Sequence, residues 1–149
     1  MSEAVMRHGG LINKFGGDSL LAIFGTPLNP TAHHADDAVK AARAMLTALE
    51  RFNEDQQRRG EPTLCIGIGI ATGPVIAGNV GSKERLEYTV IGDTVNLASR
   101  LETLTKTRLD VVLLDGATAA DAQDVQLKSL GDVKIRGKEA LVAVYTVQR

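Results

Sequence analysis

Several kinds of side chain are scarce in this chain, and each shortage excludes a class of protein. The single cysteine, Cys65, rules out an internal disulfide and a cysteine-based zinc cluster. There is no Trp, and the three Phe and two Tyr leave few rings to stack on nucleic-acid bases. A formal net charge of −1 provides no basic surface for nucleic acid or for an anionic membrane.

Long apolar runs are also lacking. No stretch reaches the roughly 18 residues that span a bilayer, and the N-terminus is not typical of a signal peptide. We therefore expect a cytoplasmic domain with no direct membrane insertion, although a longer parent protein could be membrane-anchored.

The composition is that of one ordinary globular domain. Of the 149 residues, 44% are apolar and 23% are charged, which suits a single domain over 1–149 with an aliphatic core. Cys65 lies inside an apolar run, so we expect it to be buried as a small hydrophobic residue. We find no internal repeat and no linker.

Hydrophobic periodicity predicts strands and helices in a mixed order. Two apolar runs flank Gly16-Gly17-Asp18, which predicts a hairpin because glycine readily adopts the positive φ angles of a tight turn. The remaining predicted elements are a helix over 31–59, a strand over 64–71, a glycine-rich connection over 73–81, a strand over 88–91, a helix over 95–108, a strand over 111–114, a short helix over 117–123, and paired strands over 133–135 and 141–147. This order favours an α+β fold, with helices on one face of a mixed or antiparallel sheet.

The predicted strand over 64–71 has one nearly bare face. Gly67 and Gly69 weaken a strand unless something approaches closely, which is either a packed helix, the commoner cause, or a ligand or second subunit.

Two simpler ligand signatures fail. Gly73 and Gly78 have the spacing of a phosphate-binding P-loop, but Asn79 stands where the lysine must be. His33 and His34 lack a third metal ligand at suitable spacing, so we expect exposed positions near a helix start.

Three segments carry side chains suited to a nucleotide. Lys14 and Asp18 lie on the predicted hairpin, where a turn aspartate is also ordinary loop chemistry. Asn96 and Arg100 are four residues apart, so they share one face of the predicted helix, which could equally be a solvated face. The segment 134–138 (KIRGK) is a basic turn that either holds phosphate or faces water.

Taken together and in order, these segments resemble the class III adenylyl/guanylyl cyclase catalytic domain. The resemblance runs from HGG at 8–10 to the terminal strand pair. Its most specific stretches are NKFGGDSLLAIFG and GPVIAGNVGSKERLEYTVIGDTVNLASRLE.

The resemblance implies a ferredoxin-like palm and a head-to-tail homodimer with the active site between two cyclase domains. Members of the family convert a nucleoside triphosphate to a 3′,5′-cyclic nucleotide and pyrophosphate, through attack of the 3′-hydroxyl on the α-phosphate. Two Mg²⁺ or Mn²⁺ ions assist, and Asp18 resembles the second of the two metal-binding aspartates.

The resemblance also assigns substrate contacts. Asn96 looks like the residue that orients the ribose, and Arg100 like the one that stabilises charge at the α-phosphate. Arg136, or alternatively Lys138, looks like the basic residue that holds the terminal phosphates.

The choice of base follows from two further positions. Lys14 occupies the position of the adenine-selecting lysine, where guanylyl cyclases usually have glutamate. Thr89 matches its partner, and its hydroxyl can accept a hydrogen bond from adenine N6. ATP and cyclic AMP are therefore expected. A threonine here is also found in a subgroup that includes bicarbonate-responsive enzymes.

One part of the family pattern is missing. The first metal aspartate of the family lies on an opening strand upstream of the HGG segment, where this sequence has only 1–8. Glu3 is not a plausible substitute. Either the strand lies outside this sequence or a partner supplies it, so we expect the chain alone to be a weak or inactive catalyst.

Three alternatives remain. One is a non-catalytic cyclase-like module that binds nucleotide or regulates a partner, and another is a guanylate cyclase. A diguanylate cyclase is less well matched, because Ser19-Leu20 follow the turn where that family has Glu-Phe.

Overall fold

The computed structural model describes residues 1–148. The N-terminal part of this range forms α1 (Ser2–Arg7), β1 (Leu11–Gly16), β2 (Ser19–Ile23) and α2 (His34–Arg59). It is followed by β3 (Ile68–Ile70), β4 (Ile76–Ser82), β5 (Arg85–Ile91), α3 (Asp93–Thr105), β6 (Val112–Asp115), α4 (Gly116–Asp121), β7 (Leu127–Val133) and β8 (Val142–Val147).

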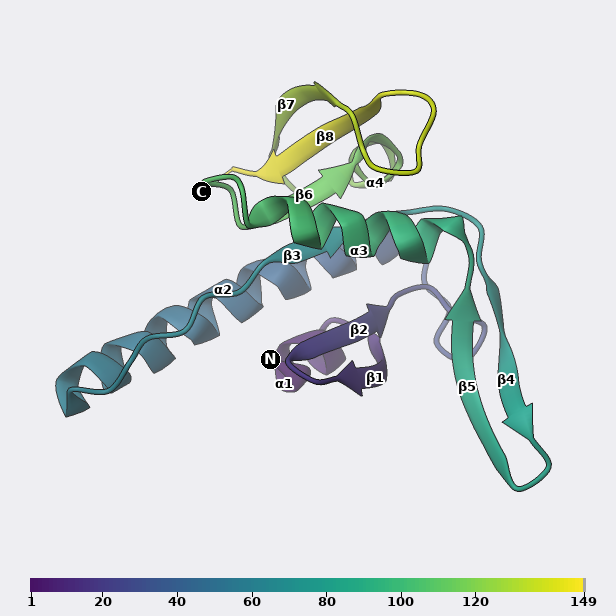
Figure 1. Ribbon diagram of the computed structural model, residues 1–149, viewed down its shortest axis with the longest axis horizontal. Coiled ribbons are helices and arrows are strands. Elements are labelled where there is room, and N and C mark those ends of the chain that lie inside the picture. The colour runs from purple at the N-terminus through teal and green to yellow at the C-terminus, as the bar shows by residue number, and fades with distance from the viewer. Residues whose placement is uncertain (149) are drawn as a thin grey trace.

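The described strands form three separate sheets. A four-stranded sheet has the order β3-β6-β8-β7, in which β3 runs parallel to β6 and the other pairs are antiparallel. The β1–β2 hairpin and the β4–β5 ribbon are antiparallel pairs of their own. Figure 1 shows the ribbon projecting away from the body and the far end of α2 extending beyond the sheet.

The predicted α+β class is confirmed, but the helices do not all lie on one face. Side chains alternate along β6, so that Leu113 packs against α3 while Val112 and Leu114 pack against α2. All three side chains are buried, which requires cover on both faces. The two long helices therefore sandwich β6.

The bare face of β3 is explained by a packed helix. A β-carbon on Gly69 would overlap the backbone of Ala98 and Glu102 in α3, and one on Gly67 would overlap the Thr105 hydroxyl. Glycine lets the two backbones approach closely, so the commoner of the two predicted causes is confirmed.

The strand predicted over 64–71 is shorter than expected, and the prediction for Cys65 is wrong. Only Ile68–Ile70 forms a strand, and Cys65 is exposed. The preceding segment is instead bound to α2. Asn53 Nδ2 donates to the Leu64 carbonyl at 2.8 Å, and the Leu64 amide donates to Asn53 Oδ1 at 2.9 Å.

The connection predicted over 73–81 contains a strand that the sequence pattern did not reveal. Ile76–Ser82 pairs residue by residue with Arg85–Ile91 to form the β4–β5 ribbon. Among the other boundaries, the helix predicted over 31–59 begins at His34, and the strand predicted over 133–135 is the end of Leu127–Val133. Within residues 1–148, no helix is both long enough and apolar enough to cross a membrane.

Candidate nucleotide site

Lys14 and Asp18 lie on the β1–β2 hairpin, as predicted. Gly17 has a φ of 62°, which makes the tight turn possible and leaves the Asp18 carboxylate exposed at its end. Lys14 is also exposed and pairs with Leu21. The Lys14 ammonium and the Asp18 carboxylate are therefore both exposed on one hairpin.

The register of this hairpin shifts between Ile12 and Lys14, which leaves Asn13 without a cross-strand partner. Asn13 reaches across to β5 instead. Its Nδ2 donates to the Tyr88 carbonyl at 2.6 Å, and the Thr89 hydroxyl donates to its Oδ1 at 3.1 Å. Asn13 thus holds Thr89 beside the strand that carries Lys14.

A second group of predicted residues gathers around α3. Asn96 is exposed on this helix, and the half-buried Arg100 lies one turn further on. The guanidinium of Arg100 packs against Gly137, whose φ of 78° shapes the basic turn. The predicted helix face and the predicted basic turn therefore meet.

The basic turn is also held by its lysines. Lys138 Nζ forms an ion pair with Asp93 at the start of α3. Lys134 Nζ donates to the carbonyls of Lys138 and Glu139 at 2.8 and 2.9 Å. Arg136 is exposed and therefore accessible to a ligand. The hydrogen bond from Lys138 holds the pKa of Asp93 below its ordinary value, and the charges of Lys138 and Arg100 act in the same direction.

The two groups are separate within one chain. No hydrogen bond or ion pair in residues 1–148 joins the hairpin group of Lys14, Asp18 and Thr89 to the α3 group. The hairpin group is held by β1, β2 and β5, and the α3 group is held by α3 and the basic turn.

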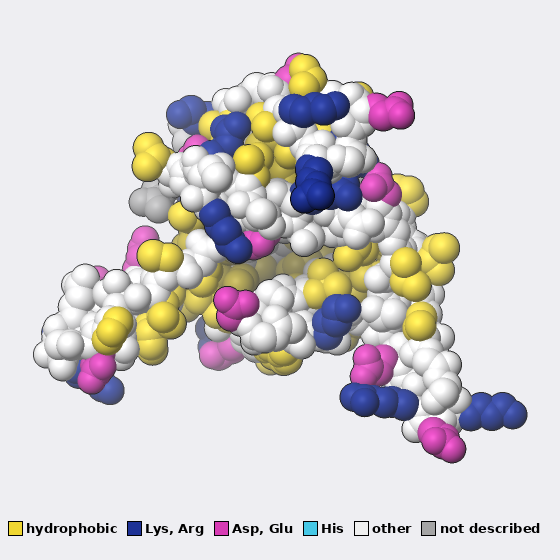
Figure 2. All heavy atoms as spheres, in the orientation of Figure 1, with side chains coloured by type: hydrophobic (Ala, Val, Ile, Leu, Met, Phe, Trp, Pro, Cys, Tyr) yellow, Lys and Arg dark blue, Asp and Glu magenta, His cyan; other side chains and the backbone are white. Residues whose placement is uncertain are grey.

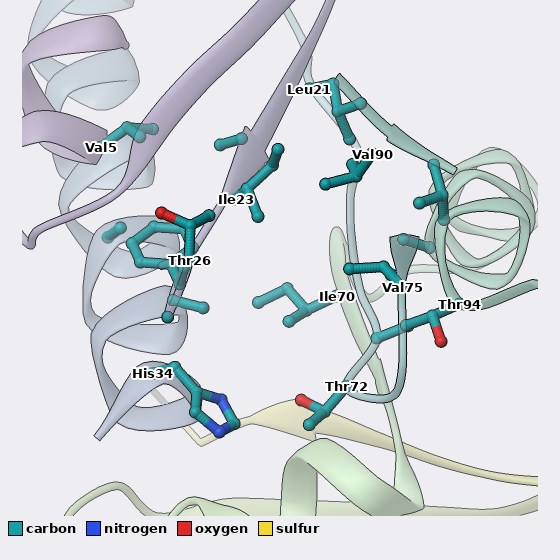
Figure 3. A pocket seen from close by; sticks show the side chains of 18 of the residues that line it. Val5, Leu21, Ile23, Thr26, His34, Ile70, Thr72, Val75, Val90 and Thr94 are labelled. Atoms are coloured by element: carbon teal, nitrogen blue, oxygen red, sulfur yellow. The ribbon is translucent and has the colours of Figure 1, made fainter. Parts of the chain in front are cut away.

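An apolar cavity of about 750 Å³ separates the β1–β2 hairpin from the four-stranded sheet. Its walls include Leu21 and Ile23 of β2, Ile70 of β3, and Val90 of β5, and Figure 3 shows their side chains pointing into the same space. Figure 2 shows hydrophobic side chains gathered in this recess. The facing edges of β2 and β3 have no strand partner among the described residues.

The side chains that could bind a metal ion gather at a place other than the hairpin. Asp18 belongs to no cluster of three such ligands within residues 1–148, so it offers a single carboxylate. The group that does cluster is His33, Asp36 and Asp124 at the start of α2. Buried Asp36 accepts hydrogen bonds there from the backbone amides of Gln123 and Asp124 at 3.2 and 2.8 Å. Both of its carboxylate oxygens therefore have a hydrogen-bond donor without a metal ion. As expected, His33 is exposed, whereas His34 is half-buried and lines the cavity.

Comparison with known proteins supports the class that the fold and these residues indicate. A sequence model described as the adenylate and guanylate cyclase catalytic domain matches residues 7–148. The chain is 42% identical over 147 residues to adenylate cyclase 1 of Rhizobium meliloti (strain 1021), covering 98% of this chain and 22% of that relative. It is 35% identical over 156 residues to an adenylate cyclase of Anabaena cylindrica, covering 99% of this chain and 30% of that protein. The chain therefore spans less than a third of the length of these curated relatives.

Solved structures are similar over almost the whole chain. The adenylyl cyclase CyaB from P. aeruginosa matches with a TM-score of 0.89 and 30% identity, covering 99% of this chain and 76% of that one. The guanylyl cyclase Cya2 matches with a TM-score of 0.84 and 32% identity, covering 98% of this chain and 73% of that one. These matches define a nucleotide cyclase fold. The chain belongs to the adenylate and guanylate cyclase catalytic domain family.

Sequence reasoning missed two residues that hold the predicted ones in place. Asn13 binds Thr89, and Asp93 binds Lys138. Neither had a signal of its own, since the bulge at Asn13 depends on pairing with β2 and the ion pair joins residues 45 positions apart.

Proposed function

We propose that this domain converts ATP to 3′,5′-cyclic AMP and pyrophosphate. The observation that carries the proposal is the cationic group at α3, where Arg100 packs on the turn that bears Arg136 and Lys138, in a chain of net charge −1. Cations concentrated in one place suit a triphosphate. Relatives named as adenylate cyclases support the reaction class.

In the proposed reaction the 3′-hydroxyl of ATP loses its proton to solvent water, and its oxygen bonds to the α-phosphorus. The bond from that phosphorus to the bridging oxygen breaks, and pyrophosphate leaves. Asn96 holds the ribose, and Arg100 donates to the α-phosphate oxygens as charge builds on them. Arg136 and Lys138 hold the departing phosphates, and Lys138 must leave Asp93 to do so.

Asp18 would supply one carboxylate to the metal site. Mg²⁺ and Mn²⁺ bind through oxygen ligands, and when bound they lower the pKa of the attacking hydroxyl and neutralise phosphate charge. A single carboxylate does not make a complete site for two ions. The proposal therefore requires at least one further carboxylate beside Asp18.

A second copy of the chain would complete the substrate site. Ile76, Val80 and Ile91 share one face of the β4–β5 ribbon with Thr89, because directly opposed residues and alternate positions point the same way. The three apolar side chains are 76%, 48% and 53% exposed. A partner that covers them would bring its α3 group against Thr89 and Lys14, which is the head-to-tail arrangement of the family.

We further propose that one extended strand fills the cavity between β2 and β3 in the active protein. Two unpaired strand edges face each other across an apolar space, and an added strand would satisfy both ladders at once. Such a strand is also the place from which a second carboxylate could reach Asp18.

The test compares residues 1–149 alone with the natural chain, by which we mean the protein that contains this sequence as the cell makes it. Both are assayed with ATP or GTP and Mn²⁺. We expect cyclic AMP from the natural chain, a preference for ATP, and little turnover from residues 1–149. Asp18→Asn should lower turnover at least about a hundred-fold while the protein stays folded. Nucleotide binding without turnover in the natural chain would favour a non-catalytic module, and preferred use of GTP would identify a guanylate cyclase. Robust cyclic AMP production by residues 1–149 would overturn the requirement for an added strand.

A further inference from the structure

Asn13 occupies the extra position of the β1 bulge, where a side chain can be redirected out of the normal alternation. Its amide lies against β5 and makes two hydrogen bonds there, one with the Tyr88 carbonyl and one with the Thr89 hydroxyl. It is the polar link between the hairpin that carries Lys14 and the strand that carries Thr89.

The direction of these hydrogen bonds is fixed by chemistry. The Tyr88 carbonyl has no hydrogen and can only accept, so the Asn13 group 2.6 Å from it must be the NH₂. The amide oxygen of Asn13 therefore faces the Thr89 hydroxyl, 3.1 Å away. Since that oxygen can also only accept, Thr89 must donate.

A threonine hydroxyl has one proton. Once this proton is bound to Asn13, the remaining lone pairs of Thr89 Oγ1 can only accept, and any ligand group at this oxygen must donate. The exocyclic amine of adenine donates at the position where guanine presents a carbonyl oxygen, which accepts. The orientation of Asn13 thus makes the Thr89 hydroxyl selective for adenine over guanine.

We propose that Asn13 is a positioning residue that sets the choice of base by fixing the Thr89 hydroxyl as an acceptor. The inference rests on the proposed function and adds to it a determinant that does not itself touch the base. Its action is on the adenine end of the nucleotide only, so the affinity for the triphosphate end should be unaffected.

A purely mechanical tether between hairpin and ribbon is the competing explanation, and two variants separate it from the proposal. Asn13→Asp keeps an acceptor for Thr89 but loses the donor to Tyr88. Asn13→Leu removes both bonds at similar size. The proposal expects Asn13→Asp to retain the preference for adenine and Asn13→Leu to lose it, whereas a tether expects both variants to behave alike.

The experiment measures binding of 3′-deoxy-ATP and 3′-deoxy-GTP, which lack the attacking hydroxyl, to the natural chain by isothermal titration calorimetry. Loss of one fixed hydrogen bond should lower the ratio of the two affinities roughly three- to ten-fold in Asn13→Leu and in Thr89→Val. The Asn13→Leu/Thr89→Val double variant should lower it no further, because both changes remove the same interaction. Thr47→Val, at an exposed position of α2, serves as the control and should leave the ratio unchanged.

Three outcomes would overturn the inference. An unchanged ratio of the two affinities in Asn13→Leu would overturn the inference by itself, provided that circular dichroism shows a folded protein. So would an unchanged ratio in Thr89→Val, which tests the hydroxyl even if Asn13→Leu does not fold. Failure of the unmodified natural chain to bind either analogue would instead overturn the proposed function, and this inference with it.

Discussion

Gly137 lies directly against the guanidinium of Arg100, and a β-carbon at this position would come within 2.8 Å of Arg100 Nη2. The close approach fixes where the arginine can sit relative to the basic turn. Any side chain at residue 137 must displace it.

Gly137→Ala should therefore impair the proposed reaction more than it impairs folding. Displacing a charge-stabilising group by about an ångström can lower kcat roughly ten- to a hundred-fold. Steady-state kinetics of the natural chain measure this loss. Gly131→Ala is a matched control, since Gly131 has a similar φ of 84° but no neighbour within 4 Å. Equal kinetic losses in the two variants would show that backbone strain, and not Arg100, is responsible.

Asp93→Asn should remove a pH-dependent contribution to stability. The pKa of Asp93 is lowered in the folded protein, so its ion pair stabilises the fold above the unfolded-state value of about 3.9 and loses that effect as pH falls through the lower folded value. The difference in Tm between the unmodified protein and Asp93→Asn should hold from pH 7 to 5 and narrow in more acid solution. Melting curves across this range test it.

Asp132 provides the control for this experiment, because it is exposed and makes no ion pair within residues 1–148. The difference in Tm between the unmodified protein and Asp132→Asn should be small at every pH in this range. A difference for Asp93→Asn that widens toward acid pH would contradict the sign of the lowered pKa.

Gly69→Ala should destabilise the domain by forcing α3 away from β3. The added methyl would overlap the backbone of Ala98 and Glu102, and overpacking of this kind typically costs about 1–3 kcal/mol. Urea unfolding gives the change in free energy. Gly78→Ala is the control, since a β-carbon at Gly78 meets nothing within 4 Å. Comparable stability of the two variants would mean that the packing of α3 on β3 does not depend on a glycine at position 69.

Ile76→Lys should weaken self-association of the chain. Ile76 is 76% exposed on the ribbon face that carries Thr89, and burying a charge where an isoleucine packs should raise the dimer Kd at least about ten-fold. Sedimentation over a range of protein concentrations measures it. Leu109→Lys changes an apolar residue that is 100% exposed away from the ribbon, and it should leave the Kd unchanged. A Kd unaffected by Ile76→Lys would remove the ribbon from the proposed interface.

Local signals were sufficient to predict the parts of the molecule that depend on nearby residues. The turn at Gly17 and the helical spacing of Asn96 and Arg100 are local, and both were predicted. The placement of Cys65 was not, because its exposure results from the side chain of Asn53 binding the neighbouring backbone. β4 was missed for a similar reason, since a glycine-rich segment becomes a strand only when a partner strand is beside it.

The supporting contacts of the site were beyond prediction. Asn13 binds residues 75 and 76 positions away along the chain, and Asp93 binds a lysine 45 positions away. No pattern in one segment specifies such a pairing. The cavity is likewise a property of two sheets facing each other.

The β4–β5 ribbon has a consequence for the motions of the domain. A two-stranded antiparallel pair is marginally stable in water by itself, and this one extends away from the buried residues of β6 (Figure 1). Its backbone amides should exchange with solvent deuterium through local opening, long before those of β6. Slower exchange in the ribbon at higher protein concentration would then report, strand by strand, how far contact with a second chain orders it.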